Sequence, residues 1–386
     1  MSHPEFDVAV VGAGILGLAH TLAASRRGLR VLLIDRTKEP RGASVRNFGM
    51  VWPIGQPAGR LEERALRSRV TWLELAREVG FWIDPCGSLH VAQHEDEERV
   101  LHEYVAASPN PRGRRFVTAR EALRLAPGLV ATGLRGALWS ESECCVDPRE
   151  AVAKLSAWLS TRPGVVARRG VTATVAGELR SGGHGVGLAD GTEYAATHVV
   201  VCPGEDLDTL FPKALGAAPL TRCKLQMLRT APQPRAWRVG PMLAAGSTLR
   251  HYSSFAACPS LPQVRARFSA ERPLFDRFGI HVMASQNGLG EVILGDSHEY
   301  GESFAPDLLA EIDEAILSYL ATFVTLPDAR PAARWSGVYA KRTDGGTEQV
   351  LAPSESVRVV TGIGGAGMTL SFGLAEEVMK ELLAEL

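Results

Sequence analysis

The chain has 386 residues, of which 45% are hydrophobic and 22% charged, a composition typical of a globular protein with room for two domains. Its net charge of -1 gives no electrostatic reason to expect nucleic acid or a membrane surface as partner, so small molecules are the expected ligands. The six cysteines form no CxxC pair and no regular ladder, which indicates neither a zinc site nor a disulfide framework. We therefore expect a cytoplasmic protein without a bound metal.

The first element is an apolar run at residues 8–24. It has no basic start and contains three glycines and His20, so we reject a signal peptide and a membrane span. The pattern instead predicts a strand at 7–11, a glycine loop, a helix at 16–27 and a strand at 30–35. This order is one βαβ unit.

Three glycines of this loop have the spacing of a dinucleotide-binding motif, and Asp35 closes the next strand. In that motif Gly12 permits the tight turn, Gly14 lets the backbone approach a pyrophosphate, and Gly17 lets the helix pack on the strand. The helix start offers free N–H groups to the phosphates. Asp35 can accept hydrogen bonds from ribose hydroxyls and disfavours a 2′-phosphate, so we expect FAD or NAD in preference to NADP.

The following elements are less regular. We expect a helix at 62–79, short strands near 88–92 and 136–139, and a helix from Pro148 to about 160. A meander at 171–202 turns at Asp190 and Gly191, and residues 219–301 are predicted to be mostly β. An amphipathic helix at 306–325, a strand at 357–361 and a helix at 371–386 complete the chain.

A second glycine loop, at residues 362–367, leads into the last helix. A helix start reached through glycines can bring N–H groups and a positive dipole end against a ligand. An NAD site made by the first loop has no evident need of it. A flavin does, because its reduction places negative charge at the ring edge, so the loop favours FAD. The alternative is an ordinary glycine-softened turn.

Four segments occur in a characteristic order: GAGILG with Asp35, GASVRNFGMVW at 42–52, VVVCPGEDLDTLF at 199–211 and GIGGAGMTLSFG at 362–373. Together they resemble the D-amino-acid oxidase and glycine oxidase superfamily of FAD-dependent amine oxidoreductases. The resemblance implies an α/β fold in which a discontinuous, Rossmann-like FAD-binding domain carries an inserted, mostly β substrate domain. The implied FAD-binding segments are 1–80, 147–216 and 331–386, and the implied substrate segments are 81–146 and 217–330.

The resemblance also implies the residues that contact FAD. They are Gly12, Gly14, Ile15, Leu16, Gly17, Asp35 and Arg36 at the ADP half, Ala43, Ser44, Arg46 and Asn47 near the pyrophosphate or flavin, Val171 and Gly204, and Gly364, Gly367, Met368 and Thr369 at the isoalloxazine. Thr369 stands where relatives similar to monomeric sarcosine oxidase carry a lysine thought to assist oxygen, so the electron acceptor is oxygen or another compound. No cysteine follows Cys258 and no histidine lies at 44–50, so FAD is expected to bind noncovalently.

An acidic amine substrate needs a cationic anchor. The candidates for substrate contact are Lys224, Arg250, His251, Tyr252, His281, Gln286, Asn287, His298, Glu299, Tyr300 and Arg342. Among them we select Lys224, His251, Tyr252 and Arg342, together with Thr369, as catalytic-site residues. His251 and Tyr252 are expected to orient the substrate, since a neutral amine demands no side-chain base. Each candidate could alternatively be a structural residue of the sheet.

The segments KLQMLRT, GDSHEYG and GGAGMTLSFG resemble a narrower branch of this superfamily that is associated with phosphonate breakdown. That resemblance implies a small aminophosphonate, such as an N-methylated 2-aminoethylphosphonate, which is oxidised to an imine and hydrolysed to an aldehyde and an amine. Glycine, sarcosine and D-amino acids are the main alternatives. An NAD-dependent dehydrogenase and a noncatalytic flavin-binding protein are further alternatives.

Overall fold

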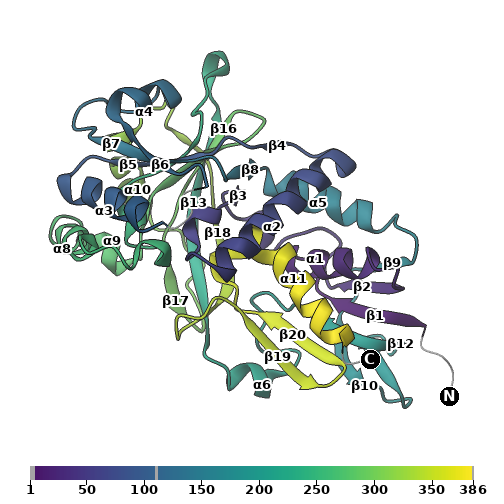
Figure 1. The fold of residues 1–386 in the computed structure, drawn as a ribbon. Coiled ribbons are helices and arrows are strands. Elements are labelled where there is room, and N and C mark those ends of the chain that lie inside the picture. Colours follow the sequence, from purple (N-terminus) through teal and green to yellow (C-terminus); the bar gives the residue numbers. More distant parts are fainter. Residues whose placement is uncertain (1–4, 109–111, 385–386) are drawn as a thin grey trace.

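The computed structural model describes residues 5–108 and 112–384, which form two halves, each built on a large sheet (Figure 1). The last two residues of the expected closing helix lie outside the described residues. Strand β1 and helix α11, which carry the two ends of the described chain, lie in the same half (Figure 1). Within the described ranges, every helix is too short or too polar to cross a membrane.

Parallel strands form the centre of the first sheet, which has eight strands. Their order is β20 (Val357–Thr361), β12 (Glu193–Val201), β1 (Phe6–Val11), β2 (Val31–Asp35) and β9 (Val165–Arg169). Antiparallel partners complete it: β10 (Ala173–Glu178) and β11 (His184–Leu188) continue from β12, and β19 (Gln349–Ser354) pairs with β20. The central strands are mainly apolar because both faces of a parallel sheet are covered.

Helices cover one face of this sheet, and the meander β10–β12 contributes to a separate apolar cluster on the other face. On β1 and β2, Val10 and Leu33 belong to the helical side, whereas Ala9 and Leu32 belong to the opposite side, as the alternation of a strand requires. The helices are α1 (Ile15–Ser25), α2 (Arg60–Leu75), α5 (Pro148–Leu159) and α11 (Gly367–Ala384). Helix α11 packs against both α1 and α2.

The second sheet has nine strands in the order β17-β13-β16-β15-β14-β5-β7-β6, and β18 also pairs with β13. Only the β14–β5 pair is parallel among the strand pairs described in this sheet. The strands are β5 (Ser88–Ala92), β6 (Arg115–Thr118), β7 (Gly136–Ser140), β13 (Leu220–Pro232), β14 (Met242–Ala244), β15 (Met283–Gln286), β16 (Glu291–Gly295), β17 (Glu299–Gly301) and β18 (Pro331–Arg342).

The largest apolar cluster of the described residues lies between this sheet and its helices. The helices of the second half are α3 (Glu95–Ala107), α4 (Ala119–Leu125), α7 (Gly246–Leu249), α8 (Leu261–Glu271), α9 (Pro273–Arg277) and α10 (Ala310–Phe323). A small sheet of β3 (Met50–Val51), β8 (Cys144–Val146) and β4 (Ile83–Asp84), and the short helix α6 (Pro212–Gly216), complete the fold. Cys144 and Cys145 are buried in β8.

The mixed α/β architecture expected from the sequence is confirmed, with two differences in detail. The block at 219–301 contains helices α8 and α9, whose apolar residues pack on the sheet. Strand β18 was assigned to the last FAD-binding segment, but it pairs with β13 along almost its whole length and so belongs to the nine-stranded sheet. The other expected domain boundaries remain predictions.

Candidate active site

A cavity of about 700 Å³ lies where the carboxyl ends of the parallel strands meet the second sheet. The last residues of β1, β2, β12 and β20 line it, as do the starts of α1 and α11. Leu225 on β13 and Gly337 to Arg342 on β18 form the opposite wall. Ligands of open α/β sheets bind outside the carboxyl ends of the strands, so this is the expected place for a dinucleotide.

The first glycine loop has the shape that phosphate binding requires. At Gly12, whose φ is +100°, a Cβ would lie 2.2 Å from the carbonyl oxygen of Cys202, and at Gly17 it would lie 1.7 Å from that of Gly12. A Cβ at Gly14 would meet only Ser44 Oγ, at 3.1 Å. Gly12 and Gly17 therefore hold the loop and helix together, whereas Gly14 leaves room at the cavity wall.

The start of α1 faces the cavity beside Ser44, whose Oγ accepts a hydrogen bond of 2.9 Å from the Ile15 N–H. The segment before β3 is fixed by Asn47, whose amide donates to the carbonyl oxygens of Ala43 and Ser44, both at 3.0 Å. Arg46 reaches across to the Ser336 carbonyl oxygen, at 3.0 Å. This segment thus ties α1 to the strand that forms the opposite wall.

Asp35 is already hydrogen-bonded within the protein. Its Oδ2 accepts from the Ala13 N–H at 2.6 Å, and its Oδ1 accepts from the N–H and hydroxyl of Thr37, both at 2.7 Å. An ionised carboxylate offers about four acceptor positions. One position on Oδ2 is therefore left for a ribose hydroxyl. Arg36, next along the chain, forms an exposed ion pair with Asp206.

The second glycine loop brings α11 against α1. A Cβ at Gly367 would lie 3.4 Å from Ile15 Cγ2, so the two helix starts are neighbours at the cavity. The Thr369 hydroxyl accepts a 3.0 Å hydrogen bond from the Trp52 N–H, and the Met368 carbonyl oxygen accepts one of 2.7 Å from Trp72 Nε1. Two positive dipole ends therefore open into one cavity, which suits a ligand with a pyrophosphate and a second electron-rich group.

All residues predicted to contact FAD line this cavity. They are Gly12, Gly14, Ile15, Leu16, Gly17, Asp35, Arg36, Ala43, Ser44, Arg46, Asn47, Val171, Gly204, Gly364, Gly367, Met368 and Thr369. The glycine cradle, the open helix starts and the remaining acceptor of Asp35 fit FAD. The individual cofactor contacts remain predictions.

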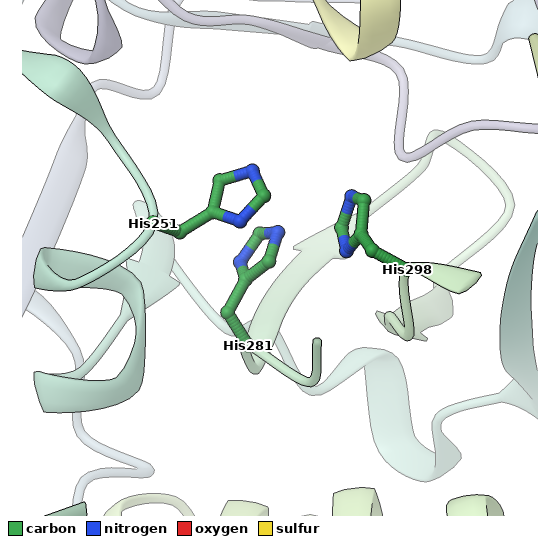
Figure 2. Close-up of side chains that lie close together, drawn as sticks. All are labelled: His251, His281 and His298. Carbon is green, nitrogen blue, oxygen red and sulfur yellow. The ribbon is translucent and has the colours of Figure 1, made fainter. Parts of the chain in front are cut away.

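Three histidines meet at the end of the cavity formed by the second sheet (Figure 2). His251 follows α7, His281 precedes β15, and His298 lies between β16 and β17. One ring nitrogen of each lies within 4.8 Å of those of the other two. The rings of His251 and His281 stack, with centroids 3.9 Å apart and 28° between their planes. The His298 ring is 4.6 Å from that of His251.

Burial disfavours the charged form of two of these imidazoles. Burial lowers the pKa of His298 to about 4. Burial, with His281 and His298 adding to it, lowers the pKa of His251 well below its ordinary value. Burial acts to raise the pKa of Asp296, but the facing His298 and His281 outweigh it and the net shift is downward. The cluster thus places two imidazoles of lowered pKa, those of His251 and His298, beside one carboxylate.

Two charged residues that the sequence analysis did not select lie at this cluster. Asp296 Oδ1 is 3.0 Å from His281 Nε2 and 3.8 Å from His298 Nδ1. Lys341 lines the cavity and donates a 3.0 Å hydrogen bond to Tyr300 Oη. Asp296 belongs to the segment GDSHEYG, and Lys341 precedes Arg342. Their position beside candidate residues was the only sequence signal that could have identified them.

Among the selected catalytic-site residues, His251, Tyr252, Arg342 and Thr369 line the cavity. The Tyr252 hydroxyl lies 3.7 Å from Met283 Sδ, and its ring packs beside Gly55. The Arg342 guanidinium is bound by Asp344 and Gln349, so its charge is largely neutralised within the protein. The neighbouring Lys341 donates to a neutral hydroxyl instead, so its charge is not neutralised in the same way.

The expectation for Lys224 is corrected by the strand geometry. Leu225 and Met227 of β13 line the cavity, so Lys224 points to the other face of the strand. Its ammonium donates to the carbonyl oxygens of Ala305 and Asp307, both at 2.9 Å. The lining formed by the described residues also leaves out these candidates: Arg250, Gln286, Asn287, Glu299 and Tyr300.

The parallel sheet covered on both faces, the glycine loop at its carboxyl edge and the second sheet beside it define a dinucleotide-binding protein. Comparison with known families makes this specific. The model of the DAO family, described as FAD dependent oxidoreductase, matches residues 7–381. The chain belongs to that family, and its cofactor is FAD.

Individual relatives are distant. The chain is 27% identical over 225 residues to the tRNA 5-methylaminomethyl-2-thiouridine biosynthesis bifunctional protein MnmC of Chromohalobacter salexigens, covering 55% of this chain and 30% of that protein. It is 27% identical over 215 residues to glycine oxidase of Geobacillus kaustophilus, covering 53% of this chain and 55% of that protein. The match thus spans less than two thirds of each of these relatives.

Solved structures support the fold over the whole chain. The glycine oxidase of Geobacillus kaustophilus superposes with a TM-score of 0.76 at 20% identity, covering 99% of this chain and 95% of that one. The dithionite-reduced L-alpha-glycerophosphate oxidase of Mycoplasma pneumoniae, solved with FAD bound, gives 0.75 at 17% identity, covering 98% and 94%. At these identities the likeness establishes the fold and leaves the substrate open.

Proposed function

We propose that this chain oxidises a small acidic primary or N-methyl amine to an imine, which water hydrolyses to an aldehyde or keto acid and an amine. One observation carries the proposal: a single cavity joins both glycine loops to a histidine-rich end that also holds Lys341. The FAD end fits the redox step, and the histidine end fits an acidic group. The relative named glycine oxidase supports amine chemistry.

In the redox step the residues of the chain would bind and position the substrate rather than act as general acids or bases. Bound FAD supplies the hydride acceptor for the carbon next to nitrogen. Trp52 and Tyr252, whose rings lie 6.4 Å apart, would wall the space where the amine sits. His251 and Tyr252 would orient a neutral amine, and anchoring the acidic group would hold the reacting carbon in place.

Within this class we favour an aminophosphonate such as N-methyl-2-aminoethylphosphonate. Support comes from the resemblance of KLQMLRT, GDSHEYG and GGAGMTLSFG to a branch associated with phosphonate breakdown. Glycine, sarcosine and D-amino acids are the competing substrates, and a noncatalytic flavin-binding protein is the competing class. The acceptor is oxygen or another compound, because Thr369 replaces the expected lysine. The cytoplasm is the proposed location on cysteine spacing alone.

The test is anaerobic mixing of the FAD-loaded protein with a panel of primary and N-methylated amino acids and aminophosphonates. The flavin band near about 450 nm reports reduction. We expect an aminophosphonate to bleach it faster than glycine or sarcosine. Readmitting air then shows whether oxygen restores the band.

The results test the substrate, the reaction and the electron acceptor separately. Bleaching by glycine or sarcosine alone would keep amine oxidation and discard the phosphonate substrate. Failure of the entire panel would discard amine oxidation and favour the noncatalytic alternative. Slow recovery of the band in air would identify a different electron acceptor.

A further inference from the structure

The geometry points to a subsite for a tetrahedral oxyanion, formed by His251, His281, His298 and Lys341, which holds the phosphonate group of the substrate. The inference rests on the proposed function, because it names where the acidic group of the amine is bound. It also assigns specificity, since the subsite is better matched to a phosphonate than to a carboxylate.

The three histidines come from separate loops of the second sheet and lie together at one end of the cavity. Lys341 on β18 lines the same cavity. Burial lowers the pKa of His251 and His298, and the charge of Lys341 contributes to this lowering. Figure 2 shows the three imidazole rings close together, each carried by a different segment of the chain. The backbone of Lys341 pairs with Ile363, and its side chain lies beside Gly364, where a Cβ would be 3.5 Å from Lys341 Cγ. The subsite therefore adjoins the second glycine loop.

The hydrogen-bond partners of two rings leave one nitrogen of each for a ligand. His298 Nδ1 lies 3.1 Å from the Gly279 carbonyl oxygen, which fits an Nδ1–H donor and leaves Nε2 available. His281 Nε2 faces Asp296, and its Nδ1 is buried without a hydrogen-bond partner among the described residues. Buried polar atoms normally have a partner, so this nitrogen is available for a hydrogen bond to a ligand in the cavity.

The charges near the rings favour binding of a dianion together with the uptake of one proton by the protein. The groups facing the cluster are Asp296, Lys341, Arg250, Tyr252, Tyr300 and Tyr339. The opposite charges of Asp296 and Lys341 offset each other, so these two groups supply little net charge to balance the ligand. A phosphonate offers three acceptor oxygens and, above its second pKa, a charge of about −2. Its second charge is best balanced by protonating one imidazole.

Only about one proton can be added, because a second would place like charges on stacked rings. The rings of His251 and His281 are stacked at 3.9 Å, so they can share one positive charge but not hold two. A carboxylate brings one charge fewer to the same site. Binding of a phosphonate is therefore expected to take up about one more proton than binding of a carboxylate.

The same stacking argues against a metal ion at these histidines. To bind one metal ion, the nitrogen lone pairs of the histidines, which lie in the ring planes, must all point at that ion. The rings of His251 and His281 are stacked, with only 28° between their planes, so their lone pairs do not readily point at a common ion. Oxyanion oxygens can be approached by several donors from different directions. The ring arrangement therefore fits an oxyanion better than a metal ion. The experiment below also tests for a metal ion.

The test uses the FAD-loaded protein and two probes without an amine, ethylphosphonate and propionate, so that binding is measured apart from oxidation. Titration calorimetry at about pH 8.5, where the phosphonate is a dianion, is run in two buffers with different heats of ionisation. We expect ethylphosphonate to bind at least about tenfold more tightly than propionate, since charged hydrogen bonds are the strong ones. Its proton uptake should exceed that of propionate by about one.

Variants assign the effect to the subsite. His298→Gln and Lys341→Met should each weaken ethylphosphonate binding at least about tenfold. His298→Gln should also reduce the difference in proton uptake. His102→Gln is the matched control, because His102 is exposed, stacks on Phe116 and lies outside the cavity lining. Flavin content of each variant reports whether it is folded.

Equal affinity and equal proton uptake for the two probes in the wild-type protein would overturn the subsite, whatever the variants do. Loss of ethylphosphonate binding after chelation, restored by Zn²⁺, would overturn it in favour of a metal site. Ethylphosphonate binding with extra proton uptake but no bleaching by any amine would keep the subsite and reject amine oxidation. Bleaching by sarcosine without ethylphosphonate binding would do the reverse.

Discussion

Gly12, Gly14 and Gly17 belong to one motif but do different physical work. The positions that a Cβ would occupy at Gly12 and Gly17 are filled by carbonyl oxygens, whereas at Gly14 the nearest atom is the Ser44 hydroxyl. The first and third glycines therefore set the distance between loop and helix. Gly14, which has no side chain, leaves space for a phosphate to approach the backbone.

Gly17→Ala tests this division. The new methyl group would lie 1.7 Å from the Gly12 carbonyl oxygen, so α1 must move away from the loop. We expect FAD affinity to fall at least about tenfold, measured by flavin fluorescence on titrating the apoprotein. The control is Gly216→Ala, where nothing lies within 4 Å of the Cβ position. Equal affinities for the two variants would contradict the assigned packing role.

His251→Phe separates orientation from proton transfer. The variant keeps a ring beside His281 but removes both nitrogens from the cavity. We expect the rate of flavin reduction at saturating amine to keep its pH profile, while substrate affinity falls about tenfold, because a ligand hydrogen bond is lost. Anaerobic stopped-flow spectroscopy measures both. Disappearance of one limb of the rate profile would instead identify His251 as the base.

At the scale of elements, the position of α11 depends on a buried arginine of α2. The Arg64 side chain is 0% exposed and donates to Glu377 of α11 at 2.6 Å and to Glu348 at 2.8 Å. It also fills the space beside Gly373, where a Cβ would be 2.6 Å from Arg64 Cγ. One side chain thus fixes the helix whose start lines the cofactor cavity.

Arg64→Met should destabilise the protein by about 1.5–3 kcal/mol, because it removes the charged hydrogen bonds of a fully buried guanidinium to the partly buried Glu377 and Glu348. The matched control is Arg60→Met, which removes another partner of Glu377 from the same helix but from a side chain that is 74% exposed. The control should cost less than about 1 kcal/mol. Urea unfolding of the FAD-loaded proteins measures both free energies. Similar losses for the two variants would show that burial of Arg64 is unimportant.

At the scale of the whole molecule, the cavity is shared by the two halves. Its lining combines the carboxyl edge of the first sheet with β13, β18 and the histidine loops of the second. A ligand seated there contacts both halves at once and stabilises their common arrangement. Cys202 is the cysteine of the described lining, and it lies beside Gly12 at the dinucleotide end.

FAD should therefore be held by noncovalent contacts alone and should contribute to global stability. Acid precipitation is expected to leave a colourless pellet and to release intact FAD into the supernatant. The apoprotein should then unfold at a lower temperature than the FAD-loaded protein, since a ligand that binds only the folded state stabilises it. A yellow pellet after washing would show a covalent link and contradict the sequence argument.

Local patterns and the resemblance to a known family together predicted the cofactor half. The glycine loops, the apolar strands and Asp35 are each encoded within a few neighbouring residues, because turn chemistry and strand alternation act over short distances. All predicted cofactor residues accordingly line one cavity. The α/β class and the use of FAD followed from the order of these signals along the chain.

The substrate half was decided by long-range pairing. Positions 251, 281 and 298 meet only because loops of the second sheet converge, and β18 joins that sheet through β13, more than a hundred residues away. Strand register turned Lys224 away from the cavity, whereas Lys341, which was not selected, lies at its wall. A shift of one residue exchanges the faces of a strand, so only the tertiary structure could choose between the two lysines.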